Sequence, residues 1–169
     1  MKSYLSKTTE EFHAADGERL LQETTSSTEG YDIQDTQVRA WKAQIEILKA
    51  SIPNDFPGRI LFEFQIPRMG RRVDVCLVTA ASIFVLEFKV GANTYNSADK
   101  DQAIDYALDL KNFHETSHNK TIVPVLIATN AAHQSNNIEF HDDGVAHLCV
   151  ANSENLAEVI AQFGPDRHV

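Results

Sequence analysis

Three charged residues interrupt apolar stretches of this sequence in a pattern that can support metal chemistry. Glu87 and Lys89 lie at the end of the apolar run IFVLEFKV, and Asp74 lies inside the earlier run RRVDVCLV. Residues two apart in a strand share a face, so Glu87 and Lys89 should point the same way. If the two runs form neighbouring strands, Asp74 can approach Glu87. Two buried carboxylates repel each other, and a bound divalent cation removes that cost.

This pattern favours hydrolysis of phosphodiester bonds. Mg²⁺ takes carboxylate oxygens, often from only two side chains, while water and substrate phosphate complete its shell. A lysine beside the cation can orient the attacking water and offset developing negative charge. The alternative is structural: Glu87 and Lys89 form a solvent-facing cross-strand ion pair, and Asp74 pairs with Arg71 or Arg72.

The surrounding periodicity predicts the elements that would position these residues. Helices are expected over residues 34–50, 98–115 and 154–163, and strands over 59–66, 72–78, 83–89, 121–129 and 145–150. Short connections make the first three strands antiparallel neighbours. The run at 121–129 is apolar on both faces, which is typical of a central parallel strand, with Pro124 at a strand start or a bulge. Ser97 is the expected N-cap of the helix that follows the third strand.

Within the first strand, the sequence alternates between apolar and polar positions. Ile60, Phe62, Phe64 and Ile66 are expected on one face, and Glu63 lies on the other. The chain is therefore expected to be an α/β protein. One domain spans residues 34–169 and includes a β-α extension at its C-terminal end, and a polar, partly helical N-terminal extension spans residues 1–33.

Composition limits the location and the partners. Hydrophobic residues make up 43% of the chain and charged residues 23%, which is ordinary for a soluble globular protein. No apolar run is long enough for a bilayer, the N-terminus lacks a signal-peptide core, and Cys76 and Cys149 read as buried thiols. These features predict a cytoplasmic protein with no membrane partner. The net charge of -9 argues against a nucleic-acid grip over the whole surface.

Together, these motifs resemble those of the PD-(D/E)xK nucleases. The matching residues are Asp74 in RRVDVCLV, Glu87 and Lys89 in VLEFKVG, and Gln102 with Tyr106 in DQAIDYALDL, similar to the QxxxY motif of the RecB-type branch. The match spans roughly residues 34–130. More narrowly, the sequence resembles a nuclease-like domain that precedes ATPase or helicase domains in some bacterial proteins. The proline usual beside the first acid is replaced here by Val73.

The resemblance implies a restriction-endonuclease-like αβββαβ core, with a mixed central sheet flanked by helices. It implies that Asp74, Glu87 and the backbone carbonyl of Phe88 hold Mg²⁺ or Mn²⁺, and that Lys89 positions the water. Further candidates are Glu63 as a third carboxylate, Gln102 and Tyr106 as braces of the site or DNA contacts, and three arginines as phosphate contacts. The arginines are Arg68, Arg71 and Arg72.

The implied substrate is DNA first and RNA second. The implied protein partners are a helicase or ATPase domain or subunit, or a second copy of the chain in a homodimer.

Two other functions stay open. The domain is a catalytically silent module for nucleic-acid or protein interaction, or it is a zinc metallopeptidase. The second rests on His114-Glu115-Thr116-Ser117-His118, which fits the HExxH pattern. The expected end of the helix at this point argues against that zinc site.

Overall fold

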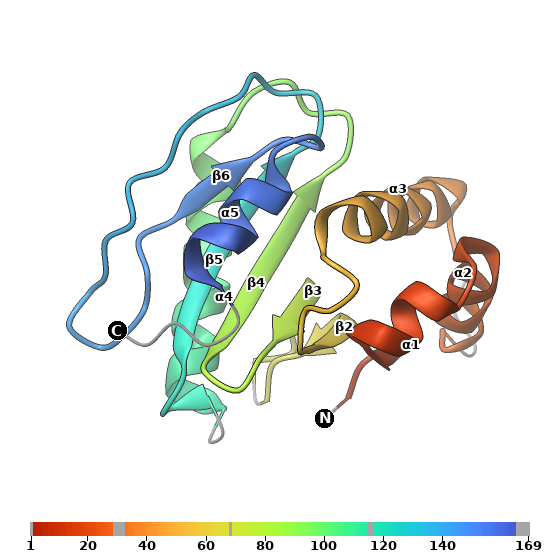
Figure 1. Ribbon diagram of the computed structural model, residues 1–169, viewed down its shortest axis with the longest axis horizontal. Helices are drawn as coiled ribbons and strands as arrows, with labels where there is room; N and C mark the ends of the chain where they lie inside the picture. Colours follow the sequence, from red (N-terminus) through yellow and green to blue (C-terminus); the bar gives the residue numbers. More distant parts are fainter. Residues whose placement is uncertain (1, 29–32, 68, 115–116, 165–169) are drawn as a thin grey trace.

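The structure is a computed structural model that describes residues 2–28, 33–67, 69–114 and 117–164. These residues form one mixed sheet and the helices packed on it (Figure 1). The strands are β1 (Leu5–Thr8), β2 (Arg59–Gln65), β3 (Arg72–Val78), β4 (Ser82–Lys89), β5 (Thr121–Ala128) and β6 (Cys149–Ala151). The helices are α1 (Thr9–Ala14), α2 (Gly17–Ser26), α3 (Asp35–Ser51), α4 (Ser97–Phe113) and α5 (Leu156–Phe163).

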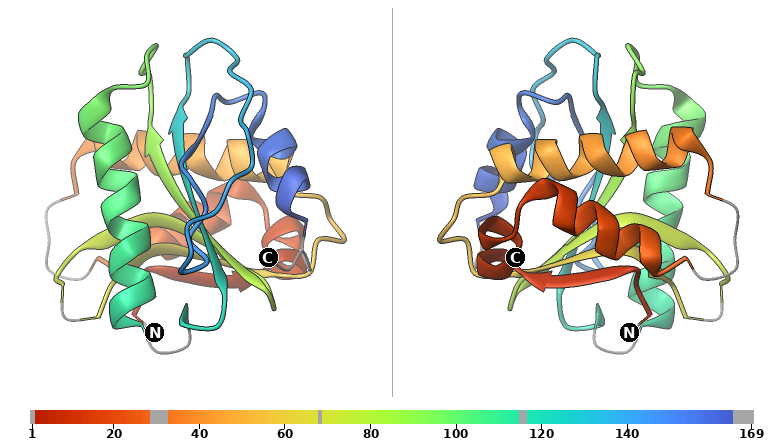
Figure 2. Two further views of the ribbon diagram at one scale, coloured as in Figure 1. Left: turned by 90° about the vertical axis from the view of Figure 1, so that its left-hand side faces the viewer. Right: turned by 90° about the vertical axis from the view of Figure 1, so that its right-hand side faces the viewer.

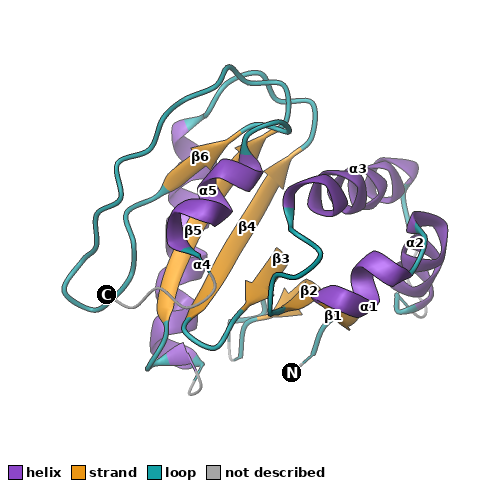
Figure 3. Cartoon of the chain, in the orientation of Figure 1, coloured by secondary structure: helices purple, strands orange, loops and turns teal. Residues whose placement is uncertain are grey.

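The sheet has the strand order β1-β2-β3-β4-β5-β6 (Figure 3). Strands β1 to β4 are antiparallel neighbours, whereas β4, β5 and β6 run parallel to one another. Short connections join β2 to β3 and β3 to β4, whereas α1, α2 and α3 lie between β1 and β2. Helix α4 is the crossover that a parallel β4–β5 pair requires. The order α3-β2-β3-β4-α4-β5 confirms the predicted α-β-β-β-α-β sequence of elements.

Helices cover both faces of the sheet and so create two apolar cores. Figure 2 shows α4 on one side of the sheet, with the remaining helices on the other. The α4 face buries Tyr106, Ala107 and Leu110 against the sheet. The opposite face buries Phe12 and Trp41, together with residues of α2 and α5. Within the described residues, no helix is long and apolar enough to cross a membrane.

Several local predictions need correction. Strand β1 was not expected, because the segment Leu5–Thr8 is short and polar, and it forms by pairing with β2. The N-cap of α4 is Asn96 and not Ser97, which is the first residue of the helix. Pro124 lies in the middle of β5, one residue before the pairing with β6 begins at Val125, so it neither starts the strand nor forms a bulge.

The predicted alternation of β2 is wrong beyond its fourth residue. Phe62 belongs to the core under α1, α2, α3 and α5, but Phe64 and Ile66 belong to the core under α4. The change of face occurs at Glu63, whose φ of 53° lies in the left-handed region. Strand β3 changes face at the matching point, because Val75 lies in the first core and Val73 in the second.

Strands β3 and β4 separate at the same level. Their pairing runs from Val78↔Ile83 to Val75↔Leu86 and stops there. Beyond it, β3 stays paired with β2, whereas β4 stays paired with β5. We call this separation of β3 residues 72–74 from β4 residues 87–89 the fork. The fork divides the sheet into a β1–β3 part and a β4–β6 part, whose strands run at an angle to each other in Figure 1.

The positive φ of Glu63 predicts an unusual order of stability for substitutions. Glu63→Gly and Glu63→Ala lose the same side-chain contacts, but only glycine adopts this backbone region without strain. We expect Glu63→Gly to be more stable than Glu63→Ala by about 1 kcal/mol. Urea unfolding of both variants measures the difference.

Gln65 on the same strand provides the control, since its φ is not in the left-handed region. There the ordinary preference should hold, with Gln65→Ala more stable than Gln65→Gly by roughly 0.5–1 kcal/mol. If alanine is also the more stable substitution at position 63, the backbone at Glu63 is not strained.

Candidate active site

A row of three carboxylates crosses the sheet at the fork. The pairs Phe62↔Val75 and Phe64↔Val73 place Glu63 of β2 opposite Asp74 of β3. Extending the β3–β4 pairing by one residue places Asp74 opposite Glu87 of β4. The acids therefore sit side by side on three neighbouring strands, at the level where β2 and β3 change face and β4 turns away.

Asp74 and Glu87 hold the fork together through their carboxylates. The backbone N–H of Asp74 donates to Glu87 Oε1 at 3.0 Å, and the backbone N–H of Phe88 donates to Asp74 Oδ2 at 2.9 Å. These bonds occupy the place where the backbone ladder has ended. The two carboxyl groups also share a side-chain hydrogen bond, which requires a proton on one of them. Two carboxyl groups held this close share either a proton or a cation.

Burial makes this acid pair electrostatically costly. Glu87 is only 3% exposed, which excludes the solvent-facing ion pair considered from the sequence. Burial, followed by the charge of Asp74, raises the pKa of Glu87 above its ordinary value. Burial also raises the pKa of Asp74, although the Phe88 N–H and the charge of Lys89 act in the opposite direction. The positive charge of Lys89 therefore does not offset the cost of burying two carboxylates together.

Lys89 is the nearby cation, and α4 fixes its position. Its Nζ donates to Gln102 Oε1 at 3.0 Å and lies 3.7 Å from Asp99 Oδ1. The other end of the Gln102 amide donates to the hydroxyl of Tyr106 at 3.0 Å. Burial and the charge of Glu87 raise the pKa of that hydroxyl, which places it in the field of the acids. Gln102 and Tyr106 thus form a hydrogen-bonded brace for Lys89.

Glu63 is turned toward α3 and away from this brace. Its Oε1 accepts a hydrogen bond from Trp41 Nε1 at 3.2 Å, and its backbone carbonyl accepts one from Arg72 Nη1 at 3.2 Å. Burial, and then the charge of Asp74, raises the pKa of Glu63 to about 7. Glu63 therefore interacts with Asp74 through charge, while its carboxylate occupies a different environment.

The predicted arginine contacts have other partners in the structure. Arg71 Nη1 lies 3.6 Å from Asp109 Oδ2 on α4. The Arg72 guanidinium lies over the ring of Tyr4, with Cζ 4.6 Å from the ring centroid. Neither arginine pairs with Asp74 among the described residues, so the salt bridge considered from the sequence is absent there. Arg68 lies outside the described residues.

The donor set suits a hard divalent cation held by few protein ligands. Carboxylate oxygens are what Mg²⁺ and Mn²⁺ prefer, and two can suffice when water and substrate fill the shell. The N–H of Phe88 points toward β3, and the carbonyl of a strand residue points to the same side as its N–H, so a third oxygen faces the fork. No group of three or more His, Cys, Asp or Glu side chains suited to a metal occurs within the described ranges. The residues thus fit a two-carboxylate site with open positions.

The described residues of the HExxH pattern lie beyond the end of α4. Helix α4 ends at Phe113, and His114 is its C-cap, with extended backbone angles. The His114 ring packs edge-on against Phe64, and its Nδ1 lies 2.6 Å from Ser117 Oγ. Glu115 and Thr116 lie outside the described residues. His114 and His118 therefore do not share the helical face on which such a zinc site depends.

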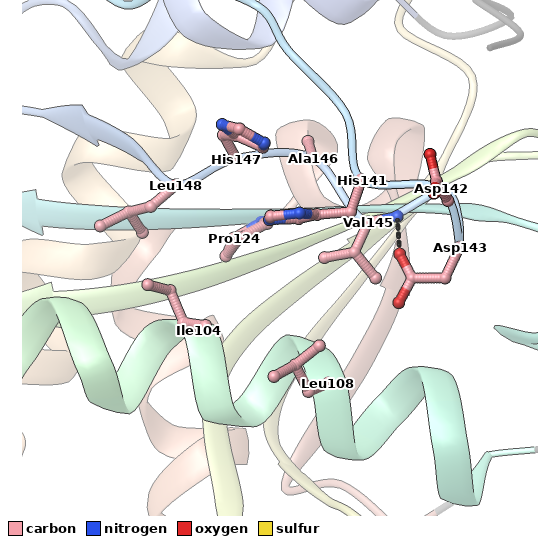
Figure 4. A pocket seen from close by; sticks show the side chains of 10 residues that line it. All are labelled: Ile104, Leu108, Pro124, His141, Asp142, Asp143, Val145, Ala146, His147 and Leu148. Atoms are coloured by element: carbon pink, nitrogen blue, oxygen red, sulfur yellow. Dashed lines mark hydrogen bonds between the residues drawn. The ribbon is translucent and has the colours of Figure 1, made fainter.

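Among the described residues, a larger hollow than any beside the fork lies between α4 and residues 141–148, with a volume of about 720 Å³ (Figure 4). Ile104 and Leu108 line its α4 side, and Val145 lies across from them. None of the predicted site residues lines it. The candidate site is thus defined by its buried charges and not by the size of a cavity.

Sequence reasoning missed two contributors to the site. Trp41 was not considered as a site residue, although a buried indole N–H usually needs an acceptor, which Glu63 provides here. Asp99 was not considered, yet it lies close to Lys89. Cys76 and Cys149 are free and buried, as expected, and burial raises the pKa of both thiols.

Comparison with known proteins adds no relative: no protein-family model matches the chain, and a search of curated proteins finds no match. The candidate site therefore rests on its own geometry.

The raised pKa of Glu87 predicts how stability depends on pH. Between the ordinary pKa of 4.5 and the raised folded value, the folded state binds more protons than the unfolded chain. Stability is then greatest below about pH 4.5 and is lost as the pH rises through the raised pKa, by about 1.4 kcal/mol for each tenfold difference in proton affinity between the two states. Glu87→Gln removes this titration and keeps an acceptor for the Asp74 N–H. In EDTA, its free energy of unfolding should fall less than that of wild type between about pH 5 and pH 8.

Urea unfolding across this pH range measures the effect, with and without Mn²⁺. Manganese should restore stability to the wild type at the higher pH, because a cation compensates the two carboxylates, and should restore less to Glu87→Gln. Parallel pH curves for the two proteins would show that Glu87 is not perturbed by folding.

Proposed function

We propose that this protein is a divalent-metal-dependent nuclease with a restriction-endonuclease-like αβββαβ core. The carrying observation is the fork, where two buried carboxyl groups from adjacent strands lie close enough to share a proton, beside a braced lysine. The order α3-β2-β3-β4-α4-β5 and the mixed sheet support the proposal. So do the positions of Asp74, Glu87, Lys89, Gln102 and Tyr106, which the PD-(D/E)xK pattern would bring together.

The proposed metal ligands are the carboxylates of Asp74 and Glu87 and the carbonyl of Phe88. A bound Mg²⁺ or Mn²⁺ would supply an activated water and would stabilise negative charge on the phosphate. The protein holds these oxygens in place through the two N–H bonds that cross the fork. Because the ligand oxygens and their supports belong to the same two strands, the site is organised before any ligand arrives.

Lys89 has the proposed role of orienting the nucleophile. Its ammonium group has three donors, of which Gln102 takes one and Asp99 lies near another. A remaining donor can bind the attacking water or a phosphate oxygen whose charge grows in the transition state. Gln102 and Tyr106 act through Lys89, by limiting where its Nζ can lie. They are positioning residues in this scheme.

DNA is the first proposed substrate and RNA the second. Arg71 and Arg72 can meet phosphates only by leaving or sharing Asp109 and Tyr4, their present partners. The net charge of -9 makes this chain a poor binder of the phosphate backbone, so another domain or subunit would provide most of the affinity for nucleic acid. A helicase or ATPase domain or subunit, or a second copy of the chain, would supply it.

Removal of Lys89 and removal of a metal ligand should have different effects. Lys89→Ala should lower the rate of plasmid nicking in Mn²⁺ or Mg²⁺ by at least about a hundredfold while leaving Mn²⁺ binding intact. Asp74→Asn should lower the rate similarly and should also weaken Mn²⁺ binding. Gel assays measure the nicking, and isothermal titration calorimetry measures the metal binding.

Lys42→Ala is the matched control, since Lys42 is exposed on α3 and away from the fork. It should cut like wild type. If the folded wild type cuts neither double-stranded nor single-stranded nucleic acid with either metal, the nuclease proposal is wrong. In that case, the domain is a silent interaction module.

A further inference from the structure

A second hollow lies beside the acid row, on the side of the sheet that faces α3. Its volume is about 350 Å³, within the range of small-molecule pockets. Residues of β2 and α3 form it, together with residues just before β1, just after α2 and just before α3. Tyr4, Gln34, Gln37, Trp41 and Glu63 are the members that matter for recognition.

The lining offers hydrogen bonds but hardly any charge. Glu63 is the one acidic residue among the described residues that line this hollow, and no lysine or arginine lines it. The side-chain amides of Gln34 and Gln37 make no hydrogen bond within the described part of the chain, so they can bind a ligand. The Glu63 carboxylate, when ionised, repels phosphate groups. The hollow therefore suits a neutral, flat group with both donors and acceptors on its edge.

The aromatic residues add a hydrophobic surface of defined shape. Trp41 is 2% exposed and forms part of the buried wall, with its Nε1 bonded to Glu63. Tyr4 meets Trp41 edge-on, with ring centroids 6.2 Å apart, and carries the Arg72 guanidinium over its ring. These contacts fix the rings before a ligand binds. Rings held in this way lose little entropy when a flat ligand packs against them.

Position links this hollow to the acid pair. Glu63 lines the hollow and lies opposite Asp74 in the β2–β3 register, so one residue borders both places.

We propose that this hollow binds a single unpaired nucleobase that carries an exocyclic amine. The amine would donate to the free oxygen of Glu63, and the Gln34 and Gln37 amides would bind the remaining edge, as glutamine does with adenine and carboxylates do with cytosine. Adenine, cytosine and guanine carry such an amine, whereas thymine does not. A stacked base in a duplex cannot enter a hollow of about 350 Å³, so the base must be unstacked or single-stranded.

This inference rests on the proposed nuclease function where it concerns the substrate. It specifies a strand with an unpaired nucleotide next to the cleaved bond. Base binding itself needs neither metal nor cleavage, and it can be measured separately.

Trp41 is the only tryptophan of the chain and lies in the wall of the hollow, so its fluorescence reports binding directly. The probes are 2′-deoxyadenosine and thymidine, titrated in EDTA. Deoxyadenosine should change the fluorescence with saturation and bind about tenfold more tightly than thymidine, which corresponds to one lost hydrogen bond. The side-chain amide signals of Gln34 and Gln37 in NMR spectra should shift in the same titration.

Variants test the contacts. Gln37→Leu should weaken deoxyadenosine binding by about tenfold, whereas Gln134→Leu, at an exposed loop position away from the hollow, should have no effect. Equal responses to both nucleosides, or none up to their solubility limit, would overturn the proposal. So would an unchanged affinity in Gln37→Leu.

The outcomes separate this inference from the nuclease proposal. Metal-dependent cutting that requires Lys89, without nucleoside selectivity, leaves the nuclease proposal standing and removes the base site. Selective nucleoside binding without any cutting supports the base site in a silent module and removes the nuclease function.

Discussion

The repulsion among buried carboxylates is the constraint around which this structure is organised. Glu63, Asp74 and Glu87 occupy matching positions on three neighbouring strands, where a regular sheet would press their side chains together. The structure relieves this repulsion in two ways. A positive φ turns Glu63 toward Trp41, and the end of the β3–β4 pairing lets the Glu87 and Asp74 carboxyl groups accept backbone N–H groups across the fork. Both departures from regular geometry occur where charge makes regular geometry unfavourable.

The rest of the fold keeps this irregular region in place. The two apolar cores lie on opposite faces, and β2 and β3 pass from one to the other at the level of the acids. Helix α4 holds Lys89 on one side through Gln102, and α3 holds Glu63 on the other through Trp41. Each flanking helix therefore contributes one hydrogen bond that fixes a charged group. The chemistry depends on the packing of both layers.

Much of this fold follows from local patterns in the sequence. The apolar run of β4 and the spacing on α3 predicted those elements, and the short connections predicted antiparallel neighbours. The acid pair could be foreseen because isolated carboxylates in buried strands need compensation. The reversal at Glu63 could not, since it arises from repulsion across strands and not from the propensity of FEFQI. Strand β1 could not be predicted either, because this polar tetrapeptide forms a strand only by pairing with the edge of β2.

The short pairing between β3 and β4 has a mechanical consequence. Only four residue pairs, from Val78↔Ile83 to Val75↔Leu86, join β3 to β4, so the β1–β3 part and the β4–β6 part of the sheet can bend relative to each other along this pairing. The angle between the two parts sets the separation of the Asp74 and Glu87 carboxyl groups. A cation bound to both groups would hold the two parts together and reduce the bending, and its loss would allow the bending again. Binding at one point would thereby change the rigidity of the whole sheet.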